Sequence, residues 1–378
     1  MTRLLMVVRE DFSFLQHRLP VALAARKLGL EVHVLSSDNG FFSDIARLGF
    51  VSHGIPKNIR SICLFGPLVL IFFYIRMFWK IRPDVIHLSS TYVCLLGGIA
   101  ALFAKRVPVI VSFTGLGYLF TSERRGWRML LRLFRPAIAF TWNRPNVFPL
   151  FQNRDDANEL RQAGFLNQQP TLIPGAGVDI SIFKPRPVKR ADHIFVIGCA
   201  ARLLKDKGIH LVVEAMEYVR PLAPQVVIKF AGTIDPFNPS SLTDSDIENW
   251  QNLAGIEFVG KQADMASFWN RCDAAILASL REGMPKALLE AAASGLPLLA
   301  SDAVGCRELV EHGKNGYLFS PSAPREIANT ILKLASDPDF CRLAGKKSRL
   351  MILDRAMDEE AVAAGYTLFL KRITTNGN

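Results

Sequence analysis

The chain has 378 residues, half of them hydrophobic, so it is too long for one ordinary core and too apolar to be disordered. Its formal net charge is +11, but residues 1–186 carry 23 Lys and Arg against 11 Asp and Glu, whereas residues 187–378 carry 22 against 23. This asymmetry indicates that one domain faces a polyanion, either a nucleic acid or an anionic bilayer. The six cysteines include no C-x-x-C pair, and we interpret them as free thiols in a reducing compartment.

In the N-terminal half, short apolar segments alternate with amphipathic ones. Strands are predicted at Leu4–Val8, Glu31–Ser36, Asp84–Leu88 and Val107–Phe113, and helices at Arg18–Leu28 and Cys94–Ala104. The first helix ends before Gly29, where a positive φ angle carries no steric cost. This alternation is typical of a parallel sheet with helices on both faces.

The C-terminal half repeats the alternation. Strands are predicted at Ile194–Ala200, Val226–Ala231, Ile256–Val259, Ala274–Ala278 and Pro297–Ala300, and helices at Gly208–Val219 and Lys286–Ser294. The segment Ile173–Pro187 between the halves is rich in Pro and Gly and is interpreted as an interdomain connection.

These patterns predict an α/β protein of two Rossmann-like, doubly wound domains that face a central cleft. The expected domains are residues 1–180 and 187–355, with a C-terminal helix at about 358–372 that packs back on the first domain. In such sheets, ligands bind outside the carboxyl ends of the strands.

The N-terminus and the apolar segments bear on the compartment. Met1–Val8 begins directly as a strand and has none of the three parts of a signal peptide. The longest apolar run, Ile62–Ile75, has 14 residues, whereas a membrane-spanning helix needs about 20. We expect a cytoplasmic protein, peripheral on the inner face of the cytoplasmic membrane.

The strongest local signal is the segment from Ala278 to Gly295, in which a predicted strand, a loop and a helix follow one another. Unpaired N–H groups at the helix start form an anion site for phosphates. Glu282 lies before this helix start and Glu290 within the helix, so their carboxylates can bind hydroxyl groups on the two sides of the phosphates. As alternatives, Glu290 pairs with Lys286 on the helix surface, or Glu282 is a solvated loop residue. The candidate donor contacts around the helix start are Gly283, Met284, Pro285, Lys286, Ala287 and Leu288.

A second signal is the basic loop from Ala201 to Gly208, which follows one predicted strand and precedes a helix. Arg202, Lys205 and Lys207 can neutralise a diphosphate as it leaves. The alternative is an ordinary basic surface loop.

Together these residues resemble glycosyltransferase family 4, which has the GT-B fold. Glu282 and Glu290 match the paired glutamates of that family, and Arg202 and Lys207 match its phosphate-binding Arg and Lys, although Ala201 stands where Gly is usual. Segments 114–120, 151–156, 172–179 and 305–310 match as well. They resemble the branch that adds sugars to polyprenyl-diphosphate-linked glycans, as in bacterial O-antigen, capsule and glycoprotein pathways.

The resemblance implies a role for each matched residue. The C-terminal domain binds the nucleotide sugar: Arg202 and Lys207 hold the donor diphosphate, Glu290 binds the ribose, and Glu282 lies near the reacting carbon of the sugar. The base, usually uracil, lies by Val259, Gly260 and Lys261. The implied reaction moves a hexose or N-acetylhexosamine from a UDP-sugar to a polyprenyl-diphosphate-linked saccharide, retains the anomeric configuration, and needs no metal or other cofactor.

The N-terminal domain departs from the family at one position. Many relatives carry a His before the glycine that is Gly115 here, but this chain has Thr114. No imidazole base is therefore assigned, and we interpret the turn as a set of backbone donors to a sugar or phosphate of the acceptor. The residues of this turn are Thr114, Gly115, Leu116 and Gly117.

A membrane-facing helix is predicted within Thr121–Arg144, which has six Arg and one Glu. Trp127, Leu131 and Phe134 recur at helical spacing, as in an interfacial helix whose cations meet anionic head groups. The arginines beside this stripe are Arg124, Arg125, Arg128 and Arg132. Leu64–Trp79 is a second apolar patch, and ordinary core packing is the alternative for both. No nucleic-acid-binding module is recognisable, so nucleic acid is not an expected partner.

The sequence admits three further interpretations. Asp244-Ser-Asp246 imitates the metal-binding D-x-D of another glycosyltransferase fold, but it lies in a loop rich in Pro, Ser and Asp and is not assigned to a metal. A nucleotide-sugar epimerase of the same fold would not need the basic, apolar N-terminal face. A non-catalytic subunit of a membrane glycosylation complex would not need Glu282, Glu290, Arg202 and Lys207.

Overall fold

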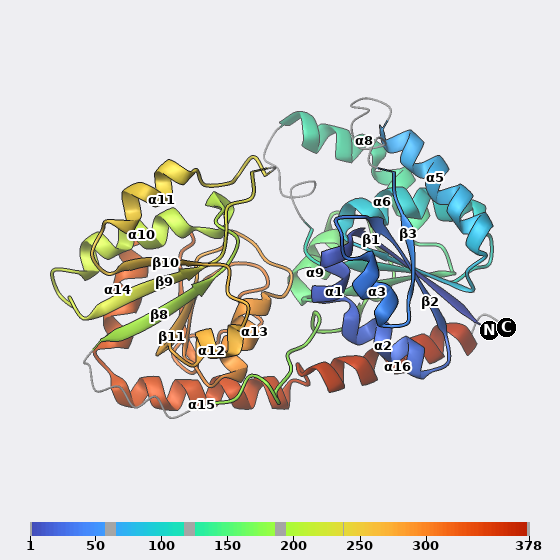
Figure 1. Cartoon of the computed structure of the whole chain (residues 1–378). Helices are drawn as coiled ribbons and strands as arrows, with labels where there is room; N and C mark the ends of the chain where they lie inside the picture. The colour runs from blue at the N-terminus through green and yellow to red at the C-terminus, as the bar shows by residue number, and fades with distance from the viewer. Residues whose placement is uncertain (1, 57–65, 117–124, 186–193, 237, 376–378) are drawn as a thin grey trace. The chain divides into compact units, whose positions relative to one another are not determined.

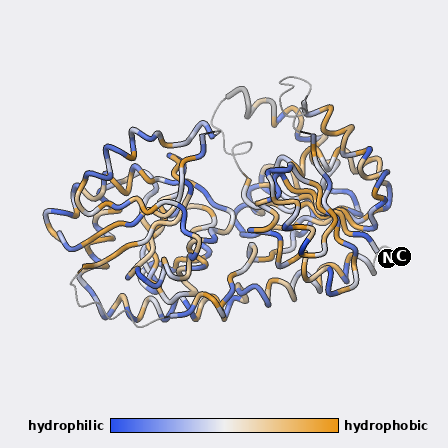
Figure 2. Tube along the Cα trace, viewed as in Figure 1, coloured by the Kyte–Doolittle hydropathy of each residue, from blue (hydrophilic) through white to orange (hydrophobic). Residues whose placement is uncertain are grey.

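The computed structural model describes residues 2–56, 66–116, 125–185, 194–236 and 238–375. The chain divides into two compact units. Unit 1 comprises Met1–Ala176 together with Glu360–Asn378, and unit 2 comprises Gly177–Glu359. In each unit the central strands are made mainly of hydrophobic residues, as Figure 2 shows.

Unit 1 is built on a parallel sheet of order β3-β2-β1-β4-β5-β6-β7 (Figure 1). Its strands are β1 (Arg3–Glu10), β2 (Glu31–Ser37), β3 (Val51–Gly54), β4 (Val85–Ser89), β5 (Val109–Phe113), β6 (Val147–Phe151) and β7 (Thr171–Leu172). One face packs against α5 (Gly66–Ile81), α6 (Thr91–Ala100), η1 (Ala101–Phe103), α8 (Arg125–Trp142) and α9 (Arg154–Gln162). The other packs against α1 (Asp11–His17), α2 (Leu19–Lys27), α3 (Phe42–Arg47) and α16 (Glu359–Thr375).

Unit 2 has a second parallel sheet, of order β10-β9-β8-β11-β12-β13. Its strands are β8 (Phe195–Ala200), β9 (Val226–Ala231), β10 (Ile256–Gly260), β11 (Ala274–Leu277), β12 (Leu298–Ser301) and β13 (Gly316–Phe319). Its helices are η2 (Lys205–Lys207), α10 (Ile209–Val219), α11 (Asp244–Gln251), α12 (Met265–Trp269), α13 (Lys286–Ala293), α14 (Pro324–Ala335) and α15 (Pro338–Asp354).

The structure confirms the predicted α/β class, with a doubly wound sheet in each unit. The predicted helix Cys94–Ala104 is wrong at both ends, because α6 begins at Thr91 and a 3₁₀ turn replaces its end after Ala100. Strands β3, β6, β7 and β13 were not predicted, since they are short or lie in segments without strong alternation. Over the described part of the chain, no helix is both long and apolar enough to cross a bilayer.

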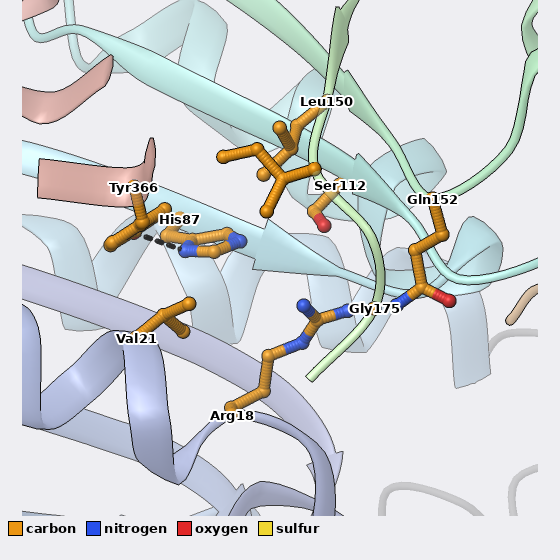
Figure 3. Close-up of a pocket in the computed structure, with 9 residues that line it drawn as sticks. Arg18, Val21, His87, Ser112, Leu150, Gln152, Gly175 and Tyr366 are labelled. Atoms are coloured by element: carbon orange, nitrogen blue, oxygen red, sulfur yellow. Dashed lines mark hydrogen bonds between the residues drawn. The ribbon is translucent and has the colours of Figure 1, made fainter. Parts of the chain in front are cut away.

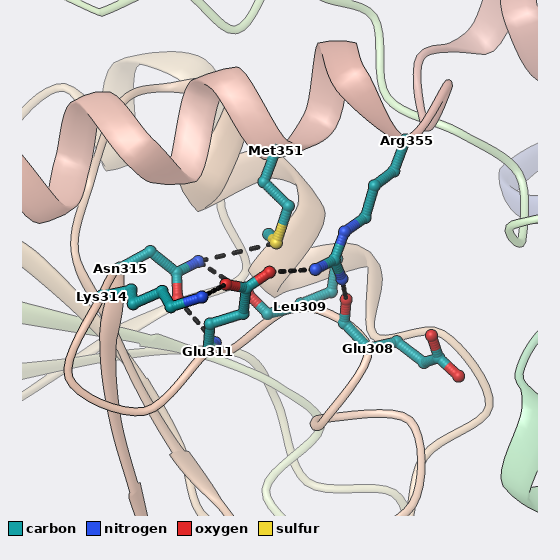
Figure 4. Close-up of polar contacts among 7 residues, drawn as sticks. All are labelled: Glu308, Leu309, Glu311, Lys314, Asn315, Met351 and Arg355. Atoms are coloured by element: carbon teal, nitrogen blue, oxygen red, sulfur yellow. Dashed lines mark hydrogen bonds and ion pairs between the residues drawn. The ribbon is translucent and has the colours of Figure 1, made fainter.

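The segment 305–315, which includes one of the family matches, is held on α15 by polar contacts (Figure 4). The buried Asn315 side chain donates to the Leu309 carbonyl oxygen at 2.9 Å and accepts from the Glu311 backbone N–H at 2.7 Å. Arg355, just after α15, pairs with the Glu311 carboxylate and donates to the Glu308 carbonyl oxygen at 2.9 Å. This loop is therefore anchored by both its backbone and its side chains.

Replacing Asn315 with alanine is expected to lower the free energy of unfolding by about 2–4 kcal/mol, because two buried backbone groups lose their partners. Urea denaturation measures the change. Lys314→Ala is the matched control next in the chain: Lys314 is largely exposed, and its loss should change stability by less than about 0.5 kcal/mol. Equal effects of the two substitutions would contradict this account of the loop.

Candidate active site

The site in unit 2 lies where the strand order of its sheet reverses. From β8 the chain proceeds to β9 and β10 on one side, then returns to β11, β12 and β13 on the other. At such a switch point the loops after the two central strands diverge and leave room for a ligand at the carboxyl ends. Here these loops are residues 201–208, which follow β8, and 278–285, which follow β11.

The two loops bring Lys207 and Glu282 together. The Lys207 ammonium is paired with Oε1 of Glu282, and the Ser279 hydroxyl donates to the same oxygen at 2.6 Å. The side chains of Lys207 and Glu282 are only 20% and 15% exposed, so solvent screens the pair less than it would a surface pair. The structure thus joins a predicted phosphate ligand and a predicted sugar ligand, which lie 75 residues apart in the chain.

Glycines permit this close approach. Gly208 has φ +67°, and a Cβ there would overlap the carbonyl oxygen of Ala278. The Leu280 backbone N–H donates to the Asp206 carbonyl oxygen at 2.9 Å, which joins the loops directly. On the other side, a Cβ at Gly305 would lie 2.6 Å from the Glu282 carbonyl oxygen. Substitution of either glycine would push one loop away from Glu282.

Arg202 lies at the outer end of the same loop. Its guanidinium donates to Oδ2 of Asp235 at 2.8 Å, and its side chain is 59% exposed. Asp235 follows β9, so the carboxyl ends of three neighbouring strands contribute charged groups here. The sequence predicted the cation but not its carboxylate partner.

Glu290 is a buried carboxylate, 7% exposed. Its Oε2 accepts a hydrogen bond from the Trp269 indole N–H at 3.1 Å. Burial raises the pKa of Glu290, while the Trp269 hydrogen bond and the charge of Lys286 lower it. The alternative of a solvated surface pair with Lys286 does not fit this burial. Trp269 was missed by the sequence reading, since a lone Trp at the end of a short helix carries no signal.

The start of α13 supplies backbone groups. Pro285 is the N-cap, and the first-turn residues Lys286 and Ala287 follow it. The Leu288 side chain is 1% exposed and packs in the core, and its backbone N–H donates to the Pro285 carbonyl oxygen at 3.1 Å, so Leu288 is a weak candidate for a donor contact. Gly283 is buried and Met284 is half-buried against the same core.

The predicted base contacts lie at the end of β10. Val259 is half-buried, Gly260 has φ +66°, and Lys261 is exposed. The Gly260 carbonyl oxygen accepts from the Gly232 N–H at 3.0 Å, which ties this strand end to the loop after β9.

The predicted acceptor turn in unit 1 follows β5. Gly115 has φ +110°, and its carbonyl oxygen accepts from the Thr91 hydroxyl at 2.8 Å. Thr114 is half-buried, while the Leu116 side chain is fully buried in the core. Gly117 lies outside the described residues. Any contact of Leu116 with an acceptor must therefore use its backbone.

The predicted membrane stripe on α8 is partly wrong. Leu131 packs against the core, and Trp142 at the end of the same helix is fully buried and donates to the Cys94 carbonyl oxygen at 3.1 Å. Phe134 is 51% exposed and Arg132 is exposed. Arg124 and the side chains of Arg125, Trp127 and Arg128 lie outside the description. The exposed apolar residues that the prediction missed on α8 are Met129, Leu133 and Phe140.

The Asp244–Asp246 motif has a structural role. The Thr243 hydroxyl accepts from the Asp246 N–H at 3.1 Å, and Asp246 accepts from the Thr243 N–H at 2.9 Å. This is a capping box that begins α11. Among the described residues there is no group of three or more His, Cys, Asp or Glu side chains placed to hold a metal ion.

Two family models match the chain. The model for group 1 glycosyl transferases matches residues 194–337, and the model for 4-like glycosyl transferases matches residues 3–146. The matched regions lie within unit 2 and unit 1, respectively.

Relatives of similar length match over nearly the whole chain. The capsular polysaccharide biosynthesis glycosyltransferase CapM of Staphylococcus aureus is 23% identical, with 92% of each chain covered. The N,N'-diacetylbacillosaminyl-diphospho-undecaprenol alpha-1,3-N-acetylgalactosaminyltransferase of Campylobacter jejuni is 22% identical, over 96% of this chain and 97% of the relative. Anabaena HepE, crystallised with UDP, is 20% identical with a TM-score of 0.78, over 98% of this chain and 100% of HepE. The last match shows that the chain has the GT-B fold.

Proposed function

Since the chain belongs to the glycosyltransferases of group 1, with a 4-like N-terminal half, we propose that it moves a sugar from a UDP-sugar to a polyprenyl-diphosphate-linked saccharide. The observation that carries the proposal is the Lys207–Glu282 pair at the switch point of unit 2. In this proposal the Lys207 ammonium stabilises the diphosphate, and the neighbouring Glu282 carboxylate contacts the sugar next to the bond that breaks.

The proposed chemistry follows from charge. When the sugar–phosphate bond breaks, negative charge develops on the leaving diphosphate. Lys207, Arg202 and the N-terminus of α13 stabilise that charge, and no metal is needed for this role. Glu282 stabilises positive charge at the reacting carbon, and Glu290 accepts from the ribose hydroxyls. We expect the product to retain the anomeric configuration of the donor.

The names of the relatives support the choice of substrates. HepE binds UDP in its crystal structures. The Campylobacter relative and an Escherichia coli relative, UDP-Gal:alpha-D-GlcNAc-diphosphoundecaprenol alpha-1,3-galactosyltransferase, act on saccharides linked to diphosphoundecaprenol. By analogy, the donor carries a hexose or an N-acetylhexosamine, and the product enters a surface polysaccharide or glycan.

Labelled UDP-sugars with and without a diphosphoundecaprenol-linked saccharide test the proposal. Transfer should require the acceptor and survive EDTA, and NMR of the product gives its anomeric configuration. Interconversion of the sugar without acceptor would identify an epimerase. The absence of turnover with every UDP-sugar tested would favour a non-catalytic subunit. Loss in EDTA that Mn²⁺ restores would overturn metal independence.

We also propose that unit 1 binds an anionic membrane surface, where a lipid-linked acceptor resides. Exposed apolar side chains recur on the outer sides of α5 and α8, two helices that cover the same face of the sheet (Figure 1). On α5, Leu68, Phe72 and Trp79 are 54%, 70% and 62% exposed, and Arg76 and Lys80 lie beside them. Such an arrangement suits insertion of apolar groups with cations at the head groups.

The double substitution Phe72→Ser with Leu133→Ser is expected to lower binding to vesicles of anionic lipid at least about 10-fold, because both side chains would insert. Flotation measures the binding, and high salt should weaken it only in part. Leu222→Ser is the matched control, since Leu222 is 73% exposed but lies in unit 2. If the double variant floats like the parent protein, this face does not meet the membrane.

A further inference from the structure

Unit 1 contains a buried arginine with no acidic partner among the residues that the structure describes. Arg18 lies at the junction of α1 and α2 and is only 4% exposed. Its Nη2 atom is buried and has no hydrogen-bond partner among the described residues. Burial lowers the pKa of Arg18 to about 10, so the guanidinium still carries its charge at neutral pH. A buried charge without a counter-charge costs several kcal/mol, which makes this placement unusual.

The groups around Arg18 cannot supply the missing negative charge. Burial raises the pKa of both the Tyr366 phenol and the Cys94 thiol, so each stays neutral. Burial also lowers the pKa of His87 well below its usual value, with a smaller contribution from Arg18. The cation therefore sits in a neutral environment within the described part of unit 1.

A second polar group beside Arg18 also lacks a partner. His87 Nδ1 lies 2.6 Å from the Tyr366 hydroxyl, whereas its Nε2 is buried and unpartnered. When the Tyr366 hydroxyl donates to Nδ1, the neutral imidazole carries its hydrogen on Nε2. Figure 3 shows the Arg18 guanidinium extending from its helix junction toward Gly175 and Ser112, with His87 on the neighbouring strand. With this tautomer, two donors that lack acceptors among the described residues line one small space.

The space itself limits what can enter. It is a cavity of about 10 Å³, which is room for the centre of a single water-sized particle. The residues that line it are Arg18, Val21, His87, Ser112, Leu150, Gln152, Ile173, Gly175 and Tyr366. A single small ion therefore suits this space better than a phosphate or carboxylate group, which has several heavy atoms.

We propose that this cavity is a halide site, in which one chloride ion accepts hydrogen bonds from Arg18 and from the Nε2–H of His87. The ion provides the counter-charge that the chain lacks here. It would also link the α1–α2 junction, β4 and α16, which carry Arg18, His87 and Tyr366. The chain returns from unit 2 to unit 1 through α16, so chloride is expected to stabilise the packing of α16 on the rest of unit 1.

Thermal unfolding of the wild-type chain tests the site. At equal ionic strength, replacing gluconate with about 0.3 M chloride should raise Tm by at least about 2 °C, because the ion binds only the folded state. Sulfate should give a smaller rise, since its five heavy atoms suit the cavity less well than a single ion does. Arg18→Met should remove the chloride response, whereas Arg161→Met, which removes an exposed arginine of unit 1, should keep it.

A crystal of the wild-type protein grown in bromide gives an independent measurement that does not depend on a variant folding. An anomalous peak between Arg18 and His87 is expected. The proposal is overturned if that position shows only the density of a water without anomalous signal. Equal Tm values in chloride and gluconate, an equal rise in sulfate, or a chloride response that survives in Arg18→Met would overturn it as well.

Discussion

Replacing Lys207 with alanine should lower turnover at least about 100-fold at saturating donor. The Lys207 ammonium is paired with Glu282, the carboxylate proposed to contact the sugar, in partly buried surroundings where its charge is weakly screened. When a diphosphate leaves, its charge grows within reach of Lys207, so the interaction is stronger in the transition state than in the ground state. Arg202→Ala should also lower turnover about 100-fold, by the same effect at the outer end of the loop.

Lys205 provides the matched control for these cations. The sequence also offered Lys205 as a cation for the diphosphate, but in η2 it is exposed and lies two residues before Lys207, so Lys205→Ala removes an equal charge from the same loop. The turnover of the Lys205→Ala variant should stay within about threefold of that of the parent enzyme. Near-normal rates for both Lys207→Ala and Arg202→Ala would show that the diphosphate is held elsewhere.

The two glutamates should separate kinetically. Glu282→Ala is expected to lower kcat about 100-fold with little change in the KM for donor, because the proposed function places Glu282 at the reacting carbon. Glu290→Ala should instead raise the KM for donor about 10-fold and weaken UDP binding, because ribose contacts are the same in ground and transition states. Steady-state kinetics and UDP titration calorimetry distinguish the two effects.

Variants that remove the hydrogen-bond donors to the two glutamates test the same assignment further. Ser279→Ala removes the hydroxyl that donates to Glu282 Oε1 at 2.6 Å, so a smaller loss of kcat of the same kind is expected. Trp269→Phe removes the donor to Glu290 and should raise the KM for donor without lowering kcat. If Ser279→Ala affected only KM, or Trp269→Phe only kcat, the roles of the two glutamates would have to be exchanged.

Local patterns predicted the core elements of both sheets. The alternation of apolar strands with helices ended by Gly29 and Gly295 identified β1, β2, β8, β9 and α13 to within one or two residues. This succeeds because burial on both faces of a parallel sheet requires continuous apolar segments, and a glycine ends a helix at a defined residue. The prediction of a phosphate site at the start of α13 rests on the same local signal.

The direction in which a helix faces was harder to predict. On α8, apolar residues occur on more than one side, so the spacing of Trp127, Leu131 and Phe134 suggested an exposed stripe. In the structure Leu131 packs against the core and Leu133 faces outward. A period of 3.6 residues identifies a face but not its neighbour, because only packing against β5, β6 and α6 decides which face is buried.

The sequence by itself determined the two-domain class, the paired glutamates and the basic loop, because each depends on residues close together in the chain. Only the tertiary structure decided that Lys207 meets Glu282, that Trp269 holds Glu290, and that Arg18 is buried without a carboxylate. The two contacts join residues on different elements, 75 and 21 residues apart in the chain, and the burial of Arg18 depends on several elements of unit 1. Their geometry depends on strand order and on close backbone approaches such as that of Gly208 to Ala278, which no local pattern encodes.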